Sequence, residues 1–525
     1  MTDLKEVPDE PEGFADLAFT SIAFPVVGIG ASAGGLSALL RFFEHMRADS
    51  GLAFVVVLQL SPQHESNAAS ILQRVTAMPV TQVLQPTLIE AGHVYVIPPS
   101  HDLTMDEGHL RLSEPTRTKG MHVAIDLFFR ALAHAGQEKS VAIVMSGTGA
   151  DGVVGLSRVK QWGGITMVQA PDDADYDAMP RAAIATGMVD FVLRSVDMPQ
   201  RLLDLWSNAS RVRLHKKGGQ SPDKITADSA KTARLAEEEL LDIMAVLQAC
   251  SKNDFRHYKR ATVLRRIARR LQVCLVQDLP AYRDYLRAHP EEPALLLQDM
   301  LMSVTNFFRD HDAFEALGAH VLPGMLSGRP TSETVRVWVP GCATGEEAFS
   351  VVMLLQEQIE QRSSSNEVQL FATDTDERAL NLGRDALYPA SIRTDVSPGR
   401  LRQFFTRQHD QFKVTKEVRE KVLFARHNLL SEPPFSRLDL ICCRNLLIYL
   451  DRKAQASILE VFCVALKPGG HLFLGAFESA DLTCGLFTVV DKKNRIYKSI
   501  LHAKALRRMP LLTGLCADLD CSHCA

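Results

Sequence analysis

Two stretches of this sequence alternate short apolar runs with amphipathic segments, and this alternation limits the possible folds more than any other feature. The first stretch carries the runs PVVGIG, AFVVVLQL, HVYVIPP, VAIVMSG and GITMVQ, and the second carries VRVWVPG, VQLFATD, LDLICCRN and GGHLFLGA. Short β-branched runs separated by helical segments indicate parallel strands joined by crossover helices. The sequence therefore predicts an α/β protein with two doubly wound, Rossmann-like domains.

The segments outside the two alternations divide the chain further. Residues 208–228 are polar and charged, which is typical of an interdomain linker, and a helical region with little strand signal follows. A chain of 525 residues also exceeds what one hydrophobic core holds. The predicted organisation is a disordered leader (1–22), a first α/β domain (23–205), a linker (206–229), a helical subdomain (230–318), a second α/β domain (319–500) and a tail (501–525).

Composition excludes several classes of partner. The formal net charge is -4 with an isoelectric point near 6.5, so neither nucleic acid nor an anionic membrane is expected as a partner. No segment is apolar enough for membrane insertion, and the acidic N-terminus is unlike a signal peptide, so we expect a cytoplasmic protein. Three cysteines and a histidine in the tail could hold zinc. An accidental cluster is the preferred interpretation of Cys516, Cys521, His523 and Cys524, and no metal site is predicted.

A glycine turn with two acidic residues follows the first strand of the second alternation. The predicted strand at Val335–Val339 runs directly into PGCATGEE at 340–347. Glycines allow a ligand close to the backbone, whereas the acidic pair disfavours phosphate and suits a cation. The next predicted strand ends at Asp374, whose carboxylate can accept both hydroxyls of a ribose. Together these features predict a cationic nucleoside cofactor such as S-adenosylmethionine.

Around these motifs the chain resembles the CheR-type chemotaxis receptor methyltransferases, over roughly Glu237–Ser499. The matching motifs are SVTNFFRD at 303–310, GCATGEE at 341–347, ATDTD at 372–376, Asn428-Leu429 and LDLICCRNLLIY at 438–449. The resemblance implies methylation of glutamate side chains on the cytoplasmic region of chemoreceptor-like proteins, and a small antiparallel β insertion around Ile392–Phe424. It also implies a cofactor pocket lined by Ser303, Thr305, Arg309, Glu347, Asp374, Asn428, Leu429, Arg444 and Asn445.

In the same resemblance Arg309 and Tyr449 face the methyl group and the acceptor glutamate, and the chemistry suits them. A carboxylate attacks the sulfonium methyl group directly, so the site must position and desolvate it rather than supply a base. A guanidinium holds a carboxylate in a defined geometry, and a tyrosine hydroxyl can orient one oxygen. The alternative for Arg309 is a structural ion pair with a nearby acid such as Asp310.

Basic residues crowd the segment from Arg256 to Arg270 in the helical region. The apolar residues between them recur at helical spacing, so we expect them to pack inward and the basic residues to face outward. A solvated face is the ordinary interpretation of such a run. In the resembling family, however, the equivalent helix docks on acidic receptor helices. We therefore predict a docking surface that includes Arg266 and Arg270, by electrostatic complementarity.

In the first alternation, Ser32 stands in a turn of small residues between a predicted strand and a helix. A serine there can be a nucleophile with backbone N–H groups nearby for an oxyanion. The alternatives are a helix N-cap and a dinucleotide-binding turn, whose glycine spacing is absent. Residues Phe24–Leu203 resemble the catalytic domain of CheB-type chemotaxis methylesterases, in GIGASAGG, MSGTGADG and YDAMPRAAI. The resemblance implies that Ser32 is the nucleophile and Asp151 its orienting acid.

The catalytic histidine of that family does not carry over. The family has Gln-His after the second strand, whereas this sequence has Leu58-Gln59, so Gln59 takes the place of the base. Glutamine cannot accept the serine proton near neutral pH, and loss of the base removes most of the rate of a serine triad. The substitutes considered are His64, His93, His101 and His122. We predict an impaired esterase, and no receiver domain in the short segment before Phe24.

Three hypotheses follow for the whole chain. The leading one is a fused methylesterase–methyltransferase of the receptor-adaptation type that retains glutamate methylation. The second is a signalling scaffold in which the esterase domain is a pseudoenzyme. The third is methylation of a small molecule or of another protein.

Overall fold

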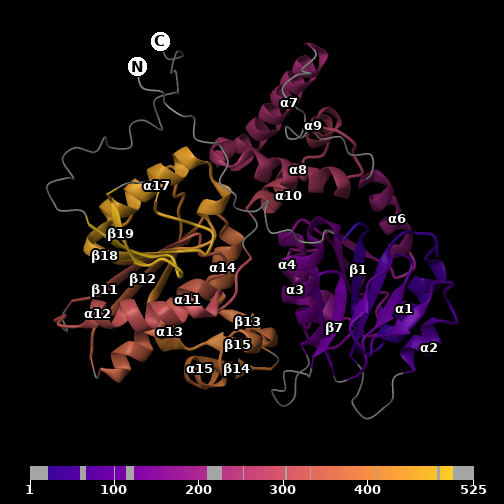
Figure 1. Ribbon diagram of the computed structural model, residues 1–525, viewed down its shortest axis with the longest axis horizontal. Coiled ribbons are helices and arrows are strands. Elements are labelled where there is room, and N and C mark those ends of the chain that lie inside the picture. Colours follow the sequence, from indigo (N-terminus) through magenta and orange to yellow (C-terminus); the bar gives the residue numbers. More distant parts are fainter. Residues whose placement is uncertain are drawn as a thin grey trace. The chain divides into compact units, whose positions relative to one another are not determined.

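The computed structural model describes residues 22–59, 67–99, 101–113, 123–209, 227–251, 253–301, 304–330, 333–362, 364–409, 411–481 and 485–500. These residues form two compact units that divide between Ser207 and Asn208, and each unit is described by itself (Figure 1). No helix among them has the length and apolar character needed to cross a membrane. The predicted leader, most of the linker and the cysteine-bearing tail lie outside the described residues, as do His64, His122 and Ser303.

The first unit is built on a seven-stranded parallel sheet, with α3 and α4 on one side and α1 and α2 on the other (Figure 1). In spatial order its strands are β10 (Phe191–Leu193), β9 (Ile165–Gln169), β8 (Ser140–Val144), β1 (Val26–Ala31), β2 (Ala53–Leu58), β5 (Val94–Val96) and β3 (Val80–Gln82). Its helices are α1 (Gly35–His45), α2 (Ala68–Leu72), α3 (Ala124–Gly136), α4 (Val153–Gln161), α5 (Ala178–Ala185) and α6 (Met198–Ala209), with a 3-10 turn at Gln137–Lys139. The central strands β1, β2 and β8 are buried throughout because helices cover both faces.

The strand order of this sheet reverses at β1, since the chain first builds outward through β2 and later returns to add β8 on the other side. Such a reversal opens a crevice at the carboxyl ends of the two strands concerned. A small antiparallel sheet is attached beside α3. It was not predicted, and it consists of β4 (Thr87–Leu88), β7 (His109–Ser113) and β6 (Asp102–Asp106).

The second unit contains a seven-stranded mixed sheet. In spatial order its strands are β16 (Val422–Arg426), β12 (Val368–Asp374), β11 (Val335–Pro340), β17 (Leu438–Cys443), β18 (Leu466–Leu474), β20 (Ile496–Ser499) and β19 (Phe487–Asp491). The first five are parallel, and β20 is antiparallel to both of its neighbours. The surrounding helices are α11 (His311–Ala316), a π-helical turn (Leu317–Val321), α12 (Leu322–Leu326), α13 (Glu346–Gln361), α14 (Glu377–Asp385) and α17 (Arg452–Ala465), with a 3-10 turn η6 (Leu447–Tyr449) after β17.

A small antiparallel sheet is inserted between α14 and β16. It comprises β13 (Leu387–Pro389), β15 (Gln411–Val414) and β14 (Phe405–Gln408), with a 3-10 turn (Ala390–Thr394) and the short helices α15 (Pro398–Phe404) and α16 (Lys416–Arg419). The helical subdomain precedes the sheet as α7 (Ala227–Ser251), a 3-10 turn η3 (Phe255–His257), α8 (Arg260–Val273), α9 (Leu279–Ala288) and α10 (Glu292–Met300). The predicted α/β fold class, with a helical subdomain and an antiparallel insertion, is confirmed.

The outward orientation predicted for the basic residues of α8 is wrong for three of them. Arg266, Arg269 and Arg270 are only 3%, 3% and 4% exposed. Arg270 forms a bidentate pair with Glu292, at 2.8 and 2.6 Å, and Arg269 pairs with Asp299. Both acids belong to α10, so the spacing of residues within α8 could not reveal them. The buried charges of Arg269 and Arg270 are tolerated because these acids neutralise them.

Candidate functional site

The carboxyl ends of β11 and β12 are tied together by Asp374. Its carboxylate accepts the backbone N–H groups of Ala343 and Asp376, each at 2.9 Å. Ala343 belongs to the glycine turn after β11, and Asp374 is the last residue of β12. Burial raises the pKa of Asp374 to about 6. The acid therefore lies where the sequence analysis expected a ribose-binding carboxylate, at the edge of the sheet.

The glycine turn after β11 has an unusual backbone. Gly345 has φ 93°, and a Cβ there would lie 2.8 Å from the ring of Phe424, so only glycine fits. Ala343 has φ 50°, a left-handed conformation that costs energy for a residue with a side chain. Such strained residues are typical of ligand sites, and this one presents its N–H group to Asp374.

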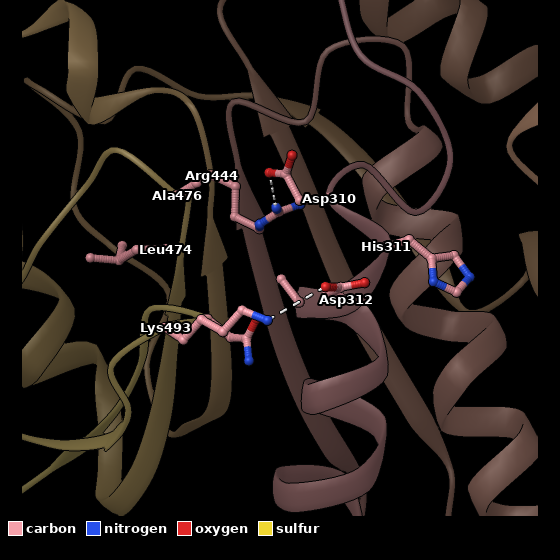
Figure 2. Close-up of a pocket in the computed structure, with 9 residues that line it drawn as sticks. Asp310, His311, Asp312, Arg444, Leu474, Ala476 and Lys493 are labelled. Carbon is pink, nitrogen blue, oxygen red and sulfur yellow. Dashed lines mark hydrogen bonds and ion pairs between the residues drawn. The ribbon is translucent and has the colours of Figure 1, made fainter. Parts of the chain in front are cut away.

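Arg444, directly after β17, joins this edge of the sheet to the segment that follows α10. Its guanidinium pairs with Asp310 at 2.7 Å, donates to the carbonyl of Arg309 at 2.9 Å and lies 3.9 Å from Glu347. Figure 2 shows Arg444 and Asp310 together on the wall of a pocket of about 300 Å³. The rings of Phe314 and Phe473 lie 4.9 and 4.7 Å from the guanidinium. The buried guanidinium of Arg444 therefore holds Asp310 and the carbonyl of Arg309 in place.

Arg309 does not form the structural ion pair with Asp310 that was considered as its alternative role. Asp310 pairs with Arg444, and no carboxylate of the described residues forms an ion pair with the guanidinium of Arg309. Glu347 nevertheless lies within electrostatic range of both arginines. Burial raises the pKa of Glu347 to about 7, against the opposing charges of Arg444 and Arg309. The interpretation of Arg309 as the partner of Asp310 is therefore wrong.

The helical subdomain borders the same region through Asn253 and Tyr258, two residues that the sequence analysis missed. Asn253 accepts a hydrogen bond at 3.4 Å from the amide of Asn428, which in turn accepts the N–H group of Leu430 at 3.0 Å. Burial raises the pKa of Tyr258, and the charges of Asp374 and Tyr449 raise it further. Tyr258 therefore lies near both residues. Neither residue carried a local signal, because the contacts join segments far apart in the chain.

The remaining predicted residues of this site are distributed around it. Tyr449 lies in η6, half-buried, and its carbonyl accepts the N–H group of Lys259 at 2.8 Å. Leu429 packs partly buried against the core between the sheet and α17. Thr305 is half-buried in the segment after α10, and Ser303 lies outside the described residues. Asn445 follows Arg444 in a left-handed conformation with φ 59°.

One group of described residues has a spacing that would suit a metal ion. Ligand atoms of His311, Asp312 and Glu315 lie within 4.8 Å of one another, and all three side chains are exposed. Nothing else in the described part of the chain points to an ion there, so we assign the group no role.

In the first unit, Ser32, Gln59 and Asp151 come together at the carboxyl ends of β1, β2 and β8. Ser32 and Gln59 follow strand ends that pair in register, and the N–H group of Gln59 donates to the carbonyl of Ala31 at 2.9 Å. Asp151 lies in the loop between β8 and α4, and the N–H group of Ser32 donates to the carbonyl of Ser146 at 3.0 Å. This is the crevice that the reversal of strand order creates.

The carboxylate of Asp151 is held firmly. It accepts backbone N–H groups of Gly152 at 2.8 Å, Asp126 at 2.9 Å and Ile125 at 3.1 Å. It also accepts a hydrogen bond from the side-chain amide of Gln59. Burial and then the charge of Asp126 raise the pKa of Asp151 well above its usual range. The acid thus bonds Gln59, the residue that the sequence analysis aligned with the family's catalytic histidine.

The geometry of the first unit bears on the N-cap role considered for Ser32 and on the histidines considered as substitute bases. Helix α1 begins at Gly35 with Gly34 as its N-cap residue, so the interpretation of Ser32 as the helix N-cap is wrong. His93 precedes β5 at the amino end of the sheet, the edge opposite Ser32. His101 is exposed and bonds the carbonyl of Pro99 at 2.8 Å. His64 and His122 lie outside the described residues.

Family models match three segments of the chain. The model described as CheB methylesterase matches residues 27–202, CheR methyltransferase, all-alpha domain, matches 238–301, and CheR methyltransferase, SAM binding domain, matches 303–496. The fold and sites thus define an S-adenosylmethionine-dependent methyltransferase domain joined to an esterase-type α/β domain. The chain belongs to the chemotaxis CheB–CheR family, as a fusion of the two domain types, and S-adenosylmethionine is its cofactor.

Individual relatives agree with this assignment. Chemotaxis protein methyltransferase 2 of Vibrio cholerae is 30% identical over 241 residues, 45% of this chain and 83% of that protein. The chemotaxis protein methyltransferase of Escherichia coli is 31% identical over 233 residues, 42% of this chain and 77% of that protein. An uncharacterized 104.1 kDa protein of Rhodobacter capsulatus is 36% identical over 441 residues, 82% of this chain but only 46% of that protein. This chain therefore spans less than half of that relative.

Among solved structures, the catalytic domain of Thermotoga maritima CheB methylesterase is similar to part of this chain. It is 24% identical with a TM-score of 0.34, and the match covers 35% of this chain and 100% of that domain.

Proposed function

We propose that this protein transfers a methyl group from S-adenosylmethionine to glutamate side chains of chemoreceptor-like proteins in the cytoplasm. The observation that carries the proposal is that the buried acid Glu347 lies near the guanidinium of Arg309, which forms no ion pair among the described residues. Glu347 and Asp374 are buried acids with raised pKa values of about 7 and 6, which suit a cationic cofactor. Arg309 lies near Glu347 without an ion-pair partner among the described residues, which leaves it available for an acceptor carboxylate.

The residues divide the work of the transfer. When bound, S-adenosylmethionine supplies an electrophilic methyl group on a positively charged sulfur. We assign Asp374 to the ribose hydroxyls, and Glu347, Asn428 and Asn445 to the polar groups of the cofactor. Arg309 and Tyr449 orient the acceptor carboxylate, whose oxygen forms the new bond to the methyl carbon as the carbon–sulfur bond breaks. No proton has to be removed, so no general base is required.

The docking surface is smaller than the sequence suggested. Arg266 and Arg270 are buried, whereas Lys259 and Arg265 are exposed on the same segment. Lys259 also donates its backbone N–H group to the carbonyl of Tyr449, so Lys259 lies next to a residue assigned to the acceptor. We propose that Lys259 and Arg265 attract the acidic face of the substrate protein.

The test is incubation of the full chain with labelled S-adenosylmethionine and membranes that contain candidate receptors. We expect base-labile methyl incorporation that is lost in R309A. The double variant K259E/R265E should lose most incorporation while it keeps its affinity for S-adenosylmethionine by calorimetry. Cofactor binding without methylation of any receptor would contradict the proposed substrate. Equal incorporation by K259E/R265E and the native chain would contradict the docking surface.

We further propose that the esterase-type domain, residues 23–205, is impaired because Gln59 cannot act as a base. The hydrogen bond from Gln59 to Asp151 supports this, since the Gln59 amide donates to the carboxylate that would otherwise orient a histidine. A signalling scaffold is the second candidate function for this domain, because Ser32 and its crevice are retained without the base. Steady hydrolysis of glutamyl methyl esters by the native chain, abolished in S32A, would refute the impairment.

A further inference from the structure

A buried acid next to the methyltransferase site has no place in the mechanism above. Glu478 follows β18 and is 4% exposed. Its Oε2 accepts the N–H groups of Gly475 at 2.7 Å and Asn445 at 3.0 Å, and its Oε1 accepts that of Ile448 at 3.3 Å. A carboxylate that collects several backbone donors from two segments fixes those segments relative to each other.

The segment held by Glu478 is the turn after β17, residues 444–449. This turn carries Asn445 and Tyr449, two of the residues assigned to the cofactor and the acceptor, and Arg444, which bonds Asp310 and the carbonyl of Arg309. Asn445 is left-handed, with φ 59°, a conformation that a side chain disfavours and that the surroundings must enforce. The hydrogen bond from its N–H group to Glu478 is one such constraint.

Asn445 also shows why the constraint matters to a ligand. Its side-chain oxygen Oδ1 is buried, and it finds no hydrogen-bond partner in the described part of the chain. A buried acceptor without a donor is costly. A cofactor rich in N–H and O–H groups can supply that donor, provided that the turn keeps Asn445 in place.

The approach of Glu478 to the turn is close and depends on a glycine. A Cβ at Gly475 would lie 2.8 Å from both the nitrogen of Asn445 and Oε2 of Glu478. Burial raises the pKa of Glu478, and its backbone donors oppose that effect. The charge of Glu478 also contributes to the raised pKa of Glu347, so the two acids lie within electrostatic range of each other.

We propose that Glu478 is a positioning residue for methyl transfer. Its carboxylate holds the turn 444–449 so that Asn445 meets the cofactor and Tyr449 meets the acceptor. The inference rests on the function proposed above for the CheR-type domain.

The test compares E478Q with a matched control in the full-length chain. The glutamine side chain keeps the size but has one acceptor oxygen, and its NH₂ group faces backbone donors. Because a lost hydrogen bond to a charged group changes binding substantially, we expect the dissociation constant for S-adenosylmethionine to rise about tenfold or more. We expect KM for the cofactor to rise by a similar factor while kcat falls less. E478D, which keeps a carboxylate, should recover part of the affinity, and it serves as the second variant if E478Q does not fold.

The control is D439N, in the same sheet but at the opposite edge. Asp439 is 6% exposed, accepts the N–H group of Arg336 at 2.8 Å and pairs with Arg329 at 2.9 Å and Lys467 at 2.8 Å. Its loss should lower the thermal midpoint without weakening cofactor binding. The inference fails if E478Q binds as the native chain does, or if D439N weakens binding equally. If the native chain itself does not bind S-adenosylmethionine, it is the proposed function that fails.

Discussion

The two units place their candidate sites at the carboxyl ends of parallel strands, but the roles proposed for their carboxylates differ. In the first unit, Asp151 accepts three backbone N–H groups and the amide of Gln59, and it can serve an esterase only through a second residue. In the second unit, Asp374 and Glu347 are proposed to contact the cofactor directly, and burial raises the pKa of both. Replacing the residue between Asp151 and the serine is enough to disable the first arrangement. The interactions proposed for Asp374 and Glu347 depend on no such second residue.

The difference also reflects the two reactions. A serine hydroxyl must give its proton to a base as it attacks an ester, and Gln59 cannot accept that proton. A glutamate carboxylate is already a nucleophile and attacks a methyl group without proton transfer. A change at position 59 can therefore impair ester hydrolysis in the first unit without affecting methyl transfer in the second.

The largest effect is expected on ester hydrolysis, when a histidine replaces Gln59 and supplies a base. In Gln59→His, one ring nitrogen can donate to Asp151, which is already held by its backbone donors, and the other can face Ser32 on the adjacent strand end. General base catalysis typically contributes about 10²- to 10⁴-fold, and we expect a gain in that range. The measurement is methanol release from methyl-esterified glutamyl peptides by the full chain.

The double variant Q59H/S32A is the control for that gain, because it keeps the new imidazole and lacks the nucleophile. It should return hydrolysis to the native level. If Q59H alone is no faster than the native chain, the first unit has lost more than its base, and the single-residue comparison between the two units is broken.

The sequence was informative where a residue's role depends on its own strand or turn. Asp374 and Gln59 could both be placed at strand ends, because each lies at the end of a short β-branched run. The comparison of Gln59 with a catalytic histidine came from the family resemblance and stays a prediction. The α/β class follows from the same runs. Sequence reasoning failed where contacts join distant segments: the burial of Arg270 depends on Glu292 of α10, and Glu478 acts on a turn 30 residues earlier.

The second prediction sharpens the contrast from the side of the methyltransferase. Asp374→Asn removes a charge that accepts two backbone N–H groups and is assigned to the ribose hydroxyls. Hydrogen bonds to charged groups are worth enough that affinity for S-adenosylmethionine should fall about tenfold to a hundredfold. Calorimetry on the full chain measures this. Asp151→Asn, the corresponding loss in the first unit, should leave cofactor affinity unchanged, and a comparable loss there would show that the two sites are not independent.

The smallest effect is expected from a change of one pH unit near neutrality, and it follows from the same acids. Burial raises the pKa of Glu347 to about 7 and that of Asp374 to about 6. A cationic cofactor favours the ionised carboxylates, so protons compete with it and affinity falls as pH decreases through these two values. Each group can contribute at most about tenfold per pH unit. Because Glu347 titrates first on acidification, E347Q should flatten the upper part of the profile and spare the lower part. An affinity that stays constant from about pH 8 to about pH 5 would mean that the cofactor does not rely on the charge of either acid.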